Sequence, residues 1–574
     1  MKFTRFFSSV LALLVLFGTV GCKKESSLKD GTYTGTGAGR NGDITVQITV
    51  SGGSVTDAKI VSESETPEIG LPAEAEILAQ FTHDGSTKNI DAVTGATLTS
   101  DGVLDALDAA LDAARGKKQV ATVYKDTSCD IVIIGAGGAG LVAATEAASK
   151  GAKVIVLEKM GIVGGNTNYS TGGINASYTK EQARLGITDS PDVFYDDTMK
   201  GGYFLNDPDL VRTLVDNSAD MVEWLQSDLV GADLSDVGIF GGATNKRIHR
   251  PQGGGAIGAH LVPLLHKAAV TQGADIRLNN KVIDILSDNG AASGVRVATA
   301  NGEYTINAQA VIVASGGFGA NSSMVTQYNP SLAGFGTTNH KGATGDAFAM
   351  VEKFDAALTQ MTQIQTHPTV VPGSGVMLTE AVRGNGAILV SRTGKRFVDE
   401  METRDVVSAA ILAEPGKTAF LVFDQSVRDS LKAINTYASQ GLLTEGATVS
   451  ELAQKLAIPS DELEETLSRY NNFVSAKKDD DYNRNPASLE RQLATAPFYA
   501  VECGPAIHHT MGGLKINTKA EVLNSSGDAI PALFAAGEVT GGVHGGNRLG
   551  GNAVADICIF GKIAADSALA YIGK

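Results

Sequence analysis

The stretch CDIVIIGAGGAG, residues 129–140, decides the fold of the largest part of this chain. Its first half is an apolar run with the length and β-branched content of a buried strand. Its second half carries the pattern G-x-G-x-x-G at Gly135, Gly137 and Gly140 and opens a helix. These glycines permit a tight turn, close approach of the backbone to a pyrophosphate and close helix packing. The stretch therefore predicts a Rossmann-like dinucleotide-binding fold.

Strands further along the chain indicate that this fold is interrupted. The strand expected over 153–157 ends at Glu158, whose carboxylate can accept hydrogen bonds from ribose hydroxyls. Two more glycine-flanked apolar strands are expected only at 310–314 and 532–536. The sequence predicts an α/β protein in which a capping, or clamp, domain of α+β type is inserted into the dinucleotide-binding domain. The predicted boundaries are 125–361 and 509–574 for the dinucleotide-binding domain and 362–508 for the cap.

A small domain is expected ahead of this fold. Residues 43–50 alternate between apolar and polar side chains, as a half-buried strand does, and 101–115 place apolar residues on one helical face. Strand and helix together predict a small α+β domain over 23–118. The charged run Lys477–Asp481, inside the cap, is expected to be a solvated surface.

The N-terminus resembles an export signal of bacterial lipoproteins. Lys2 and Arg5 precede an apolar stretch over 6–20, and Thr19-Val20-Gly21-Cys22 is similar to a lipobox, although leucine is usual at the first position. The expected signal peptide is 1–22, with Cys22 lipidated. The protein would then be exported, either anchored to the outer side of the bacterial cytoplasmic membrane or in the periplasm. The alternative is plain secretion with an incidental cysteine.

Composition excludes several classes of protein. The chain of 574 residues is 43% hydrophobic with a net charge of −16, so neither a disordered chain nor a sequence-independent nucleic-acid binder is expected. Four cysteines are too few and too scattered for a disulfide framework or a zinc site. No spacing typical of covalent haem or an iron–sulfur cluster occurs. Any anionic substrate would need a local cluster of cationic groups.

Glycine-rich motifs beyond the fingerprint point to FAD as the dinucleotide. Gly164-Gly165-Asn166-Thr167, Ser170-Thr171-Gly172-Gly173, Ala314-Ser315-Gly316-Gly317 and Ala535-Ala536-Gly537-Glu538 resemble the flavoprotein subunits of fumarate reductases and succinate dehydrogenases. By this resemblance Glu538 contacts the ribityl chain. Members that bind FAD covalently use a histidine just ahead of the Gly172-Gly173 pair, and none occurs over 159–175 here, so FAD is expected to be non-covalent. The expected cofactor-binding residues are Gly135, Gly137, Gly140, Glu158, Lys159, Asn166, Thr167, Gly172, Gly173, Ala314, Gly316 and Glu538.

The N-terminal domain carries a second flavin motif. Residues 91–100, DAVTGATLTS, resemble the FMN-binding domain that receives FMN by phosphoester transfer. The resemblance implies covalent FMN at Thr97, attached by a flavin transferase acting after export. The plain alternative is a turn before a helix, with Thr99 or Ser100 as N-cap.

Polar residues of the cap resemble those of soluble fumarate reductases related to periplasmic flavocytochrome c. The resemblance implies that His508 and Arg548 bind one carboxylate of the substrate and that His367 and Thr379 bind the other. Charge-assisted donors at both ends suit a dicarboxylate. By the same resemblance Met377 presses on the substrate and favours a twisted, polarised alkene.

The resemblance also implies the route of the proton. Arg404 would protonate one alkene carbon, with Glu380 and Arg383 passing protons inward to it. An arginine normally stays protonated, so burial and neighbouring positive charge would have to ease its proton loss. The alternative is that Arg404 only stabilises negative charge while a water donates. His509 would lie beside a bound monovalent cation, and no other metal is expected.

The sequence therefore predicts an exported FAD-dependent fumarate reductase that receives electrons through FMN from a membrane-associated, quinol- or dehydrogenase-linked donor. One alternative is a reductase of another 2-enoate, such as urocanate or an acrylate. The other is a non-catalytic flavin electron-carrier lipoprotein, which would leave the histidines and arginines unexplained.

Overall fold

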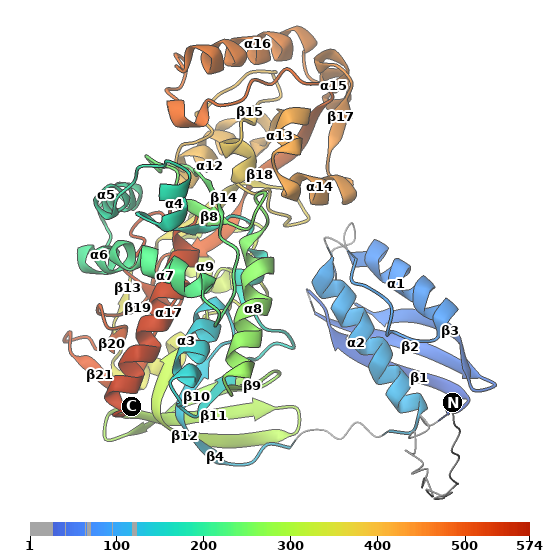
Figure 1. The fold of residues 1–574 in the computed structure, drawn as a ribbon, viewed down its shortest axis with the longest axis vertical. Coiled ribbons are helices and arrows are strands. Elements are labelled where there is room, and N and C mark those ends of the chain that lie inside the picture. The colour runs from blue at the N-terminus through green and yellow to red at the C-terminus, as the bar shows by residue number, and fades with distance from the viewer. Residues whose placement is uncertain (1–26, 41, 64, 66–69, 94–95, 118–122) are drawn as a thin grey trace, which may run out of the picture.

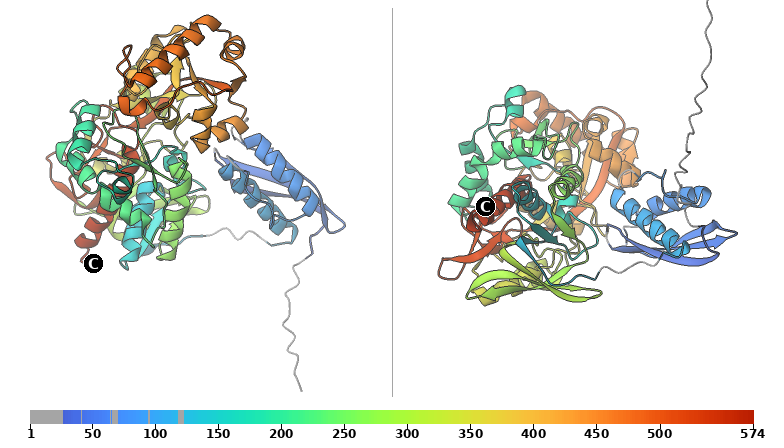
Figure 2. Two further views of the ribbon diagram at one scale, coloured as in Figure 1. Left: turned by 45° about the horizontal axis from the view of Figure 1, so that its top comes forward. Right: turned by 60° about the horizontal axis from the view of Figure 1, so that its bottom comes forward.

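The computed structural model describes residues 27–40, 42–63, 65, 70–93, 96–117 and 123–574. The expected signal peptide, Cys22, and residues 94 and 95 of the FMN motif lie outside the described residues. The N-terminal domain stands beside a larger body, and the cap lies at the far end of that body (Figures 1 and 2). In the part of the chain that is described, no helix combines the length and the apolar character needed to cross a membrane.

The N-terminal domain is a three-stranded antiparallel sheet covered by two helices. The sheet order is β1(Gly31–Ala38), β2(Asp43–Ser51), β3(Ser54–Ser62), and the helices are α1(Gly70–Asp84) and α2(Thr97–Ala114). Ile44, Val46 and Ile48 alternate onto the buried face of β2 and share one core with the apolar face of α2. Helix α2 begins four residues before the predicted start at 101, and α1 was not predicted.

The dinucleotide-binding sheet is assembled from distant segments. Its strand order is β10-β11-β12-β4-β5-β9, with β21 on β12 and β20 on β21. Strands β4, β5, β9, β12 and β21 pair in parallel where they adjoin one another. Helix α3 follows β4 directly, and α17 packs on α3. The bounds are β4(Thr127–Ile134), α3(Gly138–Ser149), β5(Val154–Leu157), β9(Asp275–Arg277), β10(Lys281–Asp288), β11(Ala291–Thr299), β12(Gly302–Val313), β20(Glu521–Leu523), β21(Ala529–Ala535) and α17(Asn552–Tyr571).

The cap is built on a second, largely antiparallel sheet of order β14-β18-β16-β15, with β17 also on β18. Strand β18 runs through the predicted boundary at 508 and carries both His508 and His509. The bounds are β14(Ile364–Val370), β15(Ile388–Val390), β16(Ala419–Asp424), β17(Thr444–Gly446), β18(Phe498–Thr510), α11(Ala381–Gly384), α12(Arg404–Ala413), α13(Gln425–Asp429), α14(Lys432–Ser439), α15(Val449–Leu456) and α16(Ser460–Ala476).

The remaining elements include two further three-stranded sheets, of order β6-β8-β7 and β13-β19-β22, and the helices that precede the cap in the chain. The helices among them are η1(Gly165–Tyr169), α4(Lys180–Arg184), α5(Pro191–Gly201), α6(Pro208–Asp216), α7(Ser218–Gln226), α8(Ile257–Thr271), α9(Ser322–Tyr328) and α10(Asp346–Val351). The strands are β6(Ile174–Asn175), β7(Asp236–Gly238), β8(Ile248–Arg250), β13(Leu358–Thr359), β19(Gly513–Lys515) and β22(Thr540–Gly541). Segment η1 follows β5 in the chain, and its last residue, Tyr169, contacts the N-terminal domain.

The expectation that Lys477–Asp481 is only a solvated surface is wrong for one residue. Asp479 is 3% exposed, and its Oδ2 lies 2.9 Å from Arg396 Nη2. Arg396 and Arg484 also pair with the buried Glu400, at 2.8 and 3.0 Å. The run turns inward because this network of buried charges needs a second carboxylate to remain compensated.

Candidate active site between the two sheets and the cap

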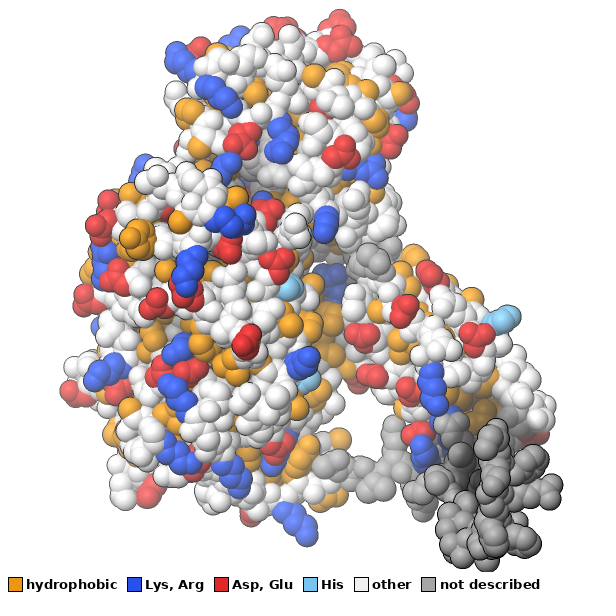
Figure 3. Space-filling model, in the orientation of Figure 1, with side chains coloured by type: hydrophobic (Ala, Val, Ile, Leu, Met, Phe, Trp, Pro, Cys, Tyr) orange, Lys and Arg blue, Asp and Glu red, His pale blue; other side chains and the backbone are white. Residues whose placement is uncertain are grey.

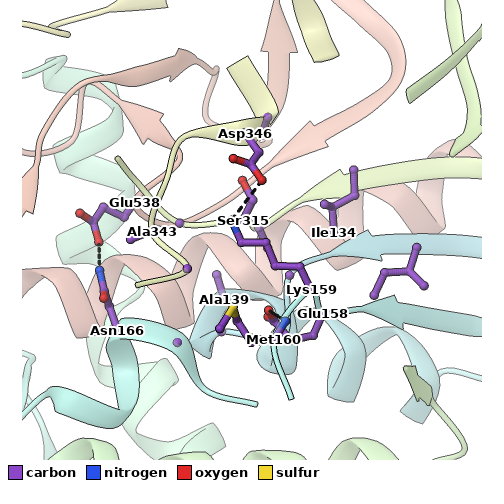
Figure 4. Close-up of a pocket in the computed structure, with 18 of the residues that line it drawn as sticks. Ile134, Ala139, Glu158, Lys159, Met160, Asn166, Ser315, Ala343, Asp346 and Glu538 are labelled. Carbon is purple, nitrogen blue, oxygen red and sulfur yellow. Dashed lines mark hydrogen bonds and ion pairs between the residues drawn. The ribbon is translucent and has the colours of Figure 1, made fainter. Parts of the chain in front are cut away.

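A cavity at the carboxyl ends of β4 and β5 forms the expected cofactor site. Of the predicted residues, those that line it are Gly135, Gly137, Glu158, Lys159, Asn166, Thr167, Ala314, Gly316 and Glu538 (Figure 4). This is the edge where parallel sheets of this kind bind ligands. Gly140 does not line the cavity. A Cβ added there would lie 2.0 Å from Gly135 O, so Gly140 serves the close packing of helix on turn.

Glu158 is held in place by backbone groups. Its Oε2 accepts from the Ala136 N–H at 3.0 Å and its Oε1 from the Met160 N–H at 2.9 Å. Burial raises the pKa of Glu158, while these two amides oppose the rise. Each carboxylate oxygen has a second lone pair, so the group can still accept from a ligand hydroxyl. Lys159 is engaged by Thr344 at 2.6 Å and Asp346 at 3.1 Å.

Glu538 and Asn166 form the opposite wall of this cavity (Figure 4). Asn166 Nδ2 donates to Glu538 Oε2 at 3.1 Å, and the Thr510 N–H donates to Glu538 Oε1 at 3.0 Å. Burial raises the pKa of Glu538 despite these donors. Two buried hydroxyls in the adjoining walls, Ser315 Oγ and Thr171 Oγ1, have no hydrogen-bond partner among the described residues. A large polar cofactor would satisfy them, so the cavity fits FAD.

A second cavity, of about 410 Å³, adjoins the first and shares Asn166, Thr167 and Glu538 with it. It lies where the FAD-type domain, the cap and the N-terminal domain meet. Figure 3 shows that the molecular surface is hollowed between the larger body and the N-terminal domain. The predicted residues that line it are Thr97, Gly172, Gly173, His367, Met377, Thr379, Glu380, Arg404, His508, His509 and Arg548.

Two histidines from neighbouring strands of the cap face each other in this cavity. His367 on β14 and His508 on β18 have ring centroids 5.1 Å apart. The Thr369 N–H donates to His367 Nδ1 at 3.3 Å, which places the hydrogen of the neutral ring on Nε2. This Nε2 is buried and has no partner in the described chain. Thr338 Oγ1 lies 2.7 Å from His508 Nδ1 and fixes the orientation of that ring.

Both rings are held neutral by their surroundings. Burial, together with Arg404, Arg383 and Arg548, lowers the pKa of His367 well below its usual value. Burial and the charges of Arg404 and Arg548 do the same for His508. Each ring therefore acts as a neutral hydrogen-bonding group at physiological pH.

Arg548 supplies positive charge to the same space. It is 4% exposed, and its Nε has no hydrogen-bond partner within the residues that are described. Its Nη1 donates to Leu549 O at 3.3 Å. Burial and the adjacent Arg404 hold the pKa of Arg548 well below its ordinary value. A buried cation with an unused donor is costly unless an anion binds it.

Arg404, Glu380 and Arg383 form the charged chain that the sequence predicted. Arg404 is the first residue of α12, and its Nε donates to Glu380 Oε2 at 2.8 Å. Arg383 Nη2 lies 3.8 Å from the same oxygen. Burial would raise the pKa of Glu380, but Arg404 and Arg383 hold it below its ordinary value. Arg383 is fully buried behind Glu380 and does not line the cavity.

Two residues that support the cavity were missed by sequence analysis: Tyr437 lines it, and Gln365 contacts two arginines that line it. Gln365 accepts from Arg404 Nη1 at 3.4 Å and donates to Arg548 O at 2.7 Å, so it ties the two arginines together. Tyr437 accepts from the Thr379 N–H at 2.9 Å and donates to Met377 O at 3.3 Å. Gln365 stands two positions before His367 on β14, a spacing that could have indicated it. Tyr437 has no comparable signal, because it reaches the site from α14.

His509 lies on the wall near the cofactor cavity. Its Nδ1 is 3.6 Å from Glu538 Oε1, and its ring centroid is 5.2 Å from that of His544. The described residues contain no group of three or more His, Cys, Asp or Glu side chains that could hold a metal ion. A monovalent cation beside His509 stays a prediction.

Among the described hydroxyl side chains of its motif, Thr97 is the one that is exposed. Thr99 is buried and donates to Glu65, and Ser100 is buried and donates to Ala96 O at 2.9 Å. Thr97 is exposed at the first residue of α2 and lines the second cavity. The N-cap of α2 is Ala96, so the alternative in which Thr99 or Ser100 caps the helix is wrong.

Comparisons with known proteins agree with this arrangement. Residues 130–554 match the model of the FAD binding domain family, and residues 39–112 match the FMN-binding domain. Fumarate reductase (cytochrome) of Shewanella frigidimarina is 48% identical over 81% of each chain. NADH:fumarate oxidoreductase of Klebsiella pneumoniae (strain 342) is 39% identical over 95% of this chain and 59% of its own length.

A solved structure of flavocytochrome c3 fumarate reductase in an open conformation is 38% identical, with a TM-score of 0.65 over 85% of this chain and 86% of its own. Relatives with other named activities also match. Urocanate reductase of Eggerthella lenta is 35% identical over 94% of this chain, and NADH:acrylate oxidoreductase of Vibrio harveyi is 34% identical over the same share.

Proposed function

Because this chain belongs to the FAD-binding fumarate reductase family and is an FAD-dependent oxidoreductase acting on a carbon–carbon double bond, with an FMN-binding domain in addition, we propose that it reduces fumarate to succinate. The observation that carries the proposal is the pair of unsatisfied buried donors in one cavity, His367 Nε2 and Arg548 Nε. A substrate with carboxylates at both ends would use both donors.

Each end of the substrate has its own set of protein groups. Arg548 and His508 bind one carboxylate, and His367 and Thr379 bind the other. The neutral histidines donate hydrogen bonds without adding charge, so Arg548 is the cation of the binding site. Met377 lines the same cavity, and its proposed role is to press on the alkene.

Reduction adds two electrons and two protons to fumarate, and the protein's own residues supply the second proton. When bound and reduced, FAD supplies a hydride to one alkene carbon. Arg404 donates the proton to the other carbon. His367 and His508 are held neutral, which favours Arg404 over an imidazolium as the proton donor. Glu380, 2.8 Å from Arg404, returns a proton to it, and Arg383 supplies Glu380.

Electrons reach this site through the N-terminal domain. FMN is attached through a phosphoester to Thr97, whose hydroxyl is exposed where the second cavity meets α2. A flavin transferase attaches FMN after export. Residues 1–22 direct the export, and Cys22 carries the lipid anchor. A membrane-associated quinol- or dehydrogenase-linked protein is the electron donor. Mass spectrometry of the N-terminal peptide from the membrane fraction tests the anchor. The wild-type peptide should carry lipid at Cys22, and Cys22→Ser should leave the protein unlipidated.

A panel of substrates tests the proposed activity. Oxidation of a reduced viologen dye is followed with fumarate, urocanate and acrylates, and fumarate should give by far the highest kcat/KM. The specific reason is that a monocarboxylate leaves one of the two donor sets unpaired, and an unpaired buried donor costs about 1–3 kcal/mol. A preference for urocanate or an acrylate would favour the activities of those relatives instead.

A further inference from the structure

One contact between the N-terminal domain and the FAD-binding domain is made by an arginine and a tyrosine. Tyr169, the last residue of η1, donates from its hydroxyl to Arg40 O at 3.0 Å. The guanidinium carbon of Arg40 lies 4.6 Å from the centroid of the same ring. Arg40 follows β1, while η1 also carries Asn166 and Thr167 of the cofactor cavity. The contact is therefore made by the very turn that shapes the cofactor site.

A second contact lies beside the first and leaves no room for a side chain. A Cβ added at Gly161 would lie 2.5 Å from the Cβ of Ala38, the last residue of β1. Its next neighbours would be Asn279 Oδ1 at 3.6 Å and Ala38 Cα at 3.8 Å, which are ordinary contacts. Gly161 is not among the residues with a positive φ. Glycine is needed here for space between the domains and not for an unusual backbone conformation.

A third contact joins the N-terminal domain to the cap. Ala73 and Ala96 are buried with the apolar cluster of the cap, and Val93 packs against this cluster and against the core of its own domain. Ala96 directly precedes Thr97. The three contacts together bring Thr97 to the wall of the cavity that holds His367 and Arg404.

The aromatic ring of Tyr169 extends the contact with Arg40 towards the cofactor cavity. Its centroid lies 5.8 Å from that of His340, which lines the cofactor cavity. Burial, with the charges of Lys341, Lys159 and Arg40, lowers the pKa of His340 to about 4. Arg40, Tyr169 and the neutral His340 thus form an unbroken path of contacts from the N-terminal domain to the cofactor cavity.

We propose that Arg40 and Ala38 on the N-terminal domain, with Tyr169 and Gly161 on the FAD-binding domain, form a docking site that holds the FMN-bearing domain where it can pass electrons to FAD. The inference rests on the proposed role of FMN at Thr97. In each turnover two electrons leave reduced FMN and reduce FAD, and the same two electrons then pass to fumarate with two protons. Gly161 lines neither cavity and is a positioning residue, whereas Arg40 also lines the second cavity, so Gly161 gives the cleaner test of docking.

The tight contact allows a complementary exchange of one methyl group. Gly161→Ala places a methyl against Ala38 Cβ, and overpacking of this kind should lower the docking equilibrium about 5- to 150-fold. Ala38→Gly combined with Gly161→Ala removes the clashing atom and should restore docking. Arg40→Ala keeps the carbonyl that Tyr169 uses and loses only the cation over the ring, so a smaller fall of about 2- to 5-fold is expected. Lys59→Ala, which removes an exposed cation from β3, is the matched control.

Two measurements on the protein that carries both FMN and FAD test the docking site. Rapid mixing follows the rate at which FAD is reduced by FMN, and small-angle scattering follows the separation of the domains without any turnover. Gly161→Ala should slow FAD reduction and increase the radius of gyration, the double variant should restore both, and viologen-driven fumarate reduction should be unchanged in Gly161→Ala, the double variant and Lys59→Ala. A wild-type rate in Gly161→Ala, or no recovery in the double variant, overturns the docking site.

The proposed function can fail separately from the docking site. If FMN is present and reducible but Thr97→Ala leaves reduction by the native donor intact, FMN is not the electron input, whatever the scattering shows. If Thr97→Ala abolishes that reduction while the Gly161 and Arg40 variants transfer electrons at the wild-type rate, FMN is the input and the docking site is wrong.

Discussion

Arg404 stands at the first residue of α12 with its Nε bonded to Glu380, and the proposed mechanism assigns it the proton that is transferred in the transition state. Arg404→Ala should lower kcat by about 100- to 10,000-fold, the usual range for a positioned acid, with little change in fumarate binding. Steady-state kinetics gives kcat, and perturbation of the FAD absorption on adding fumarate gives the binding constant.

Two further substitutions test the same assignment of Arg404. Arg404→Lys keeps a charge and a proton but loses the planar fork, so partial activity is expected. His367→Ala removes a ground-state carboxylate contact and should mainly raise KM, with some loss of kcat, because misplacing the alkene by about 1 Å can cost roughly 100-fold. A near-normal kcat in Arg404→Ala, or loss of fumarate binding, would assign the proton to another group.

Asp399 shows how a residue outside the cavity makes stability depend on pH. It is 8% exposed, and burial and Glu400 raise its pKa from 3.8 to about 6. The folded protein therefore binds more protons than the unfolded chain between about pH 4 and 6, so this carboxyl lowers stability as the pH rises through that window. Asp399→Asn keeps an oxygen that accepts from the Met401 N–H. The variant should be more stable at pH 7 by up to about 3 kcal/mol and similar to wild type at pH 4, measured by thermal unfolding.

The opposite trend, a gain at pH 4 that disappears at pH 7, would show that Asp399 is stabilised as the anion. If Asp399→Asn and wild type were equally stable at both pH values, the carboxyl would be better solvated than its 8% exposure indicates.

At the scale of single elements, helix α2 determines which hydroxyl is available for FMN. It starts at Thr97, so Thr99 and Ser100 lie in its first turn and are buried, while Thr97 stays exposed. Thr97→Ala should leave FAD in place and remove the covalent flavin. After acid precipitation of wild type, FAD should be released and FMN should stay with the polypeptide. The variant should lose reduction by its native donor and keep viologen-driven turnover.

Thr97→Ser is the matched control, because it keeps the hydroxyl at the same helical position and should keep FMN. A covalent flavin retained in Thr97→Ala would place the attachment at another residue. Equal loss of activity with both donors would assign the N-terminal domain a role in stability.

At the scale of the whole molecule, the cap and the FAD-binding domain are joined beside the cavity. The Tyr203 hydroxyl donates to Asp405, which directly follows Arg404 on α12. Tyr203→Phe removes this bond and should loosen the cap. A hydrogen bond contributes about 1 kcal/mol, so KM for fumarate should rise about fivefold with kcat nearly unchanged. Steady-state kinetics with fumarate checks the split.

Lys246→Ala provides the comparison. It breaks another contact between these domains, an ion pair at 2.8 Å to Glu490, but both partners are substantially exposed, and such pairs contribute little. KM should therefore stay within about twofold of wild type. If Tyr203→Phe changes kcat alone, the contact serves the chemistry of Arg404 and not closure of the cap.

The sequence by itself determined the parts that depend on local geometry. The glycine pattern at 135–140 specifies a turn through steric limits that act within a few residues, and the alternation in 43–50 specifies one buried face of a strand. These features predicted the FAD-type fold and the N-terminal domain, and resemblance to a known family supplied the residues that line the cavity. Helix α1 was missed.

Only the tertiary structure decided what depends on contacts between distant segments. It buried Asp479 beside Arg396, hid Arg383 behind Glu380, brought Tyr437 into the cavity and placed Gln365 against Arg404. It also placed Arg40 against Tyr169, which is 129 residues away in the chain. Burial and charge compensation are set by which surfaces pack together, and a local pattern of residue types does not contain that information.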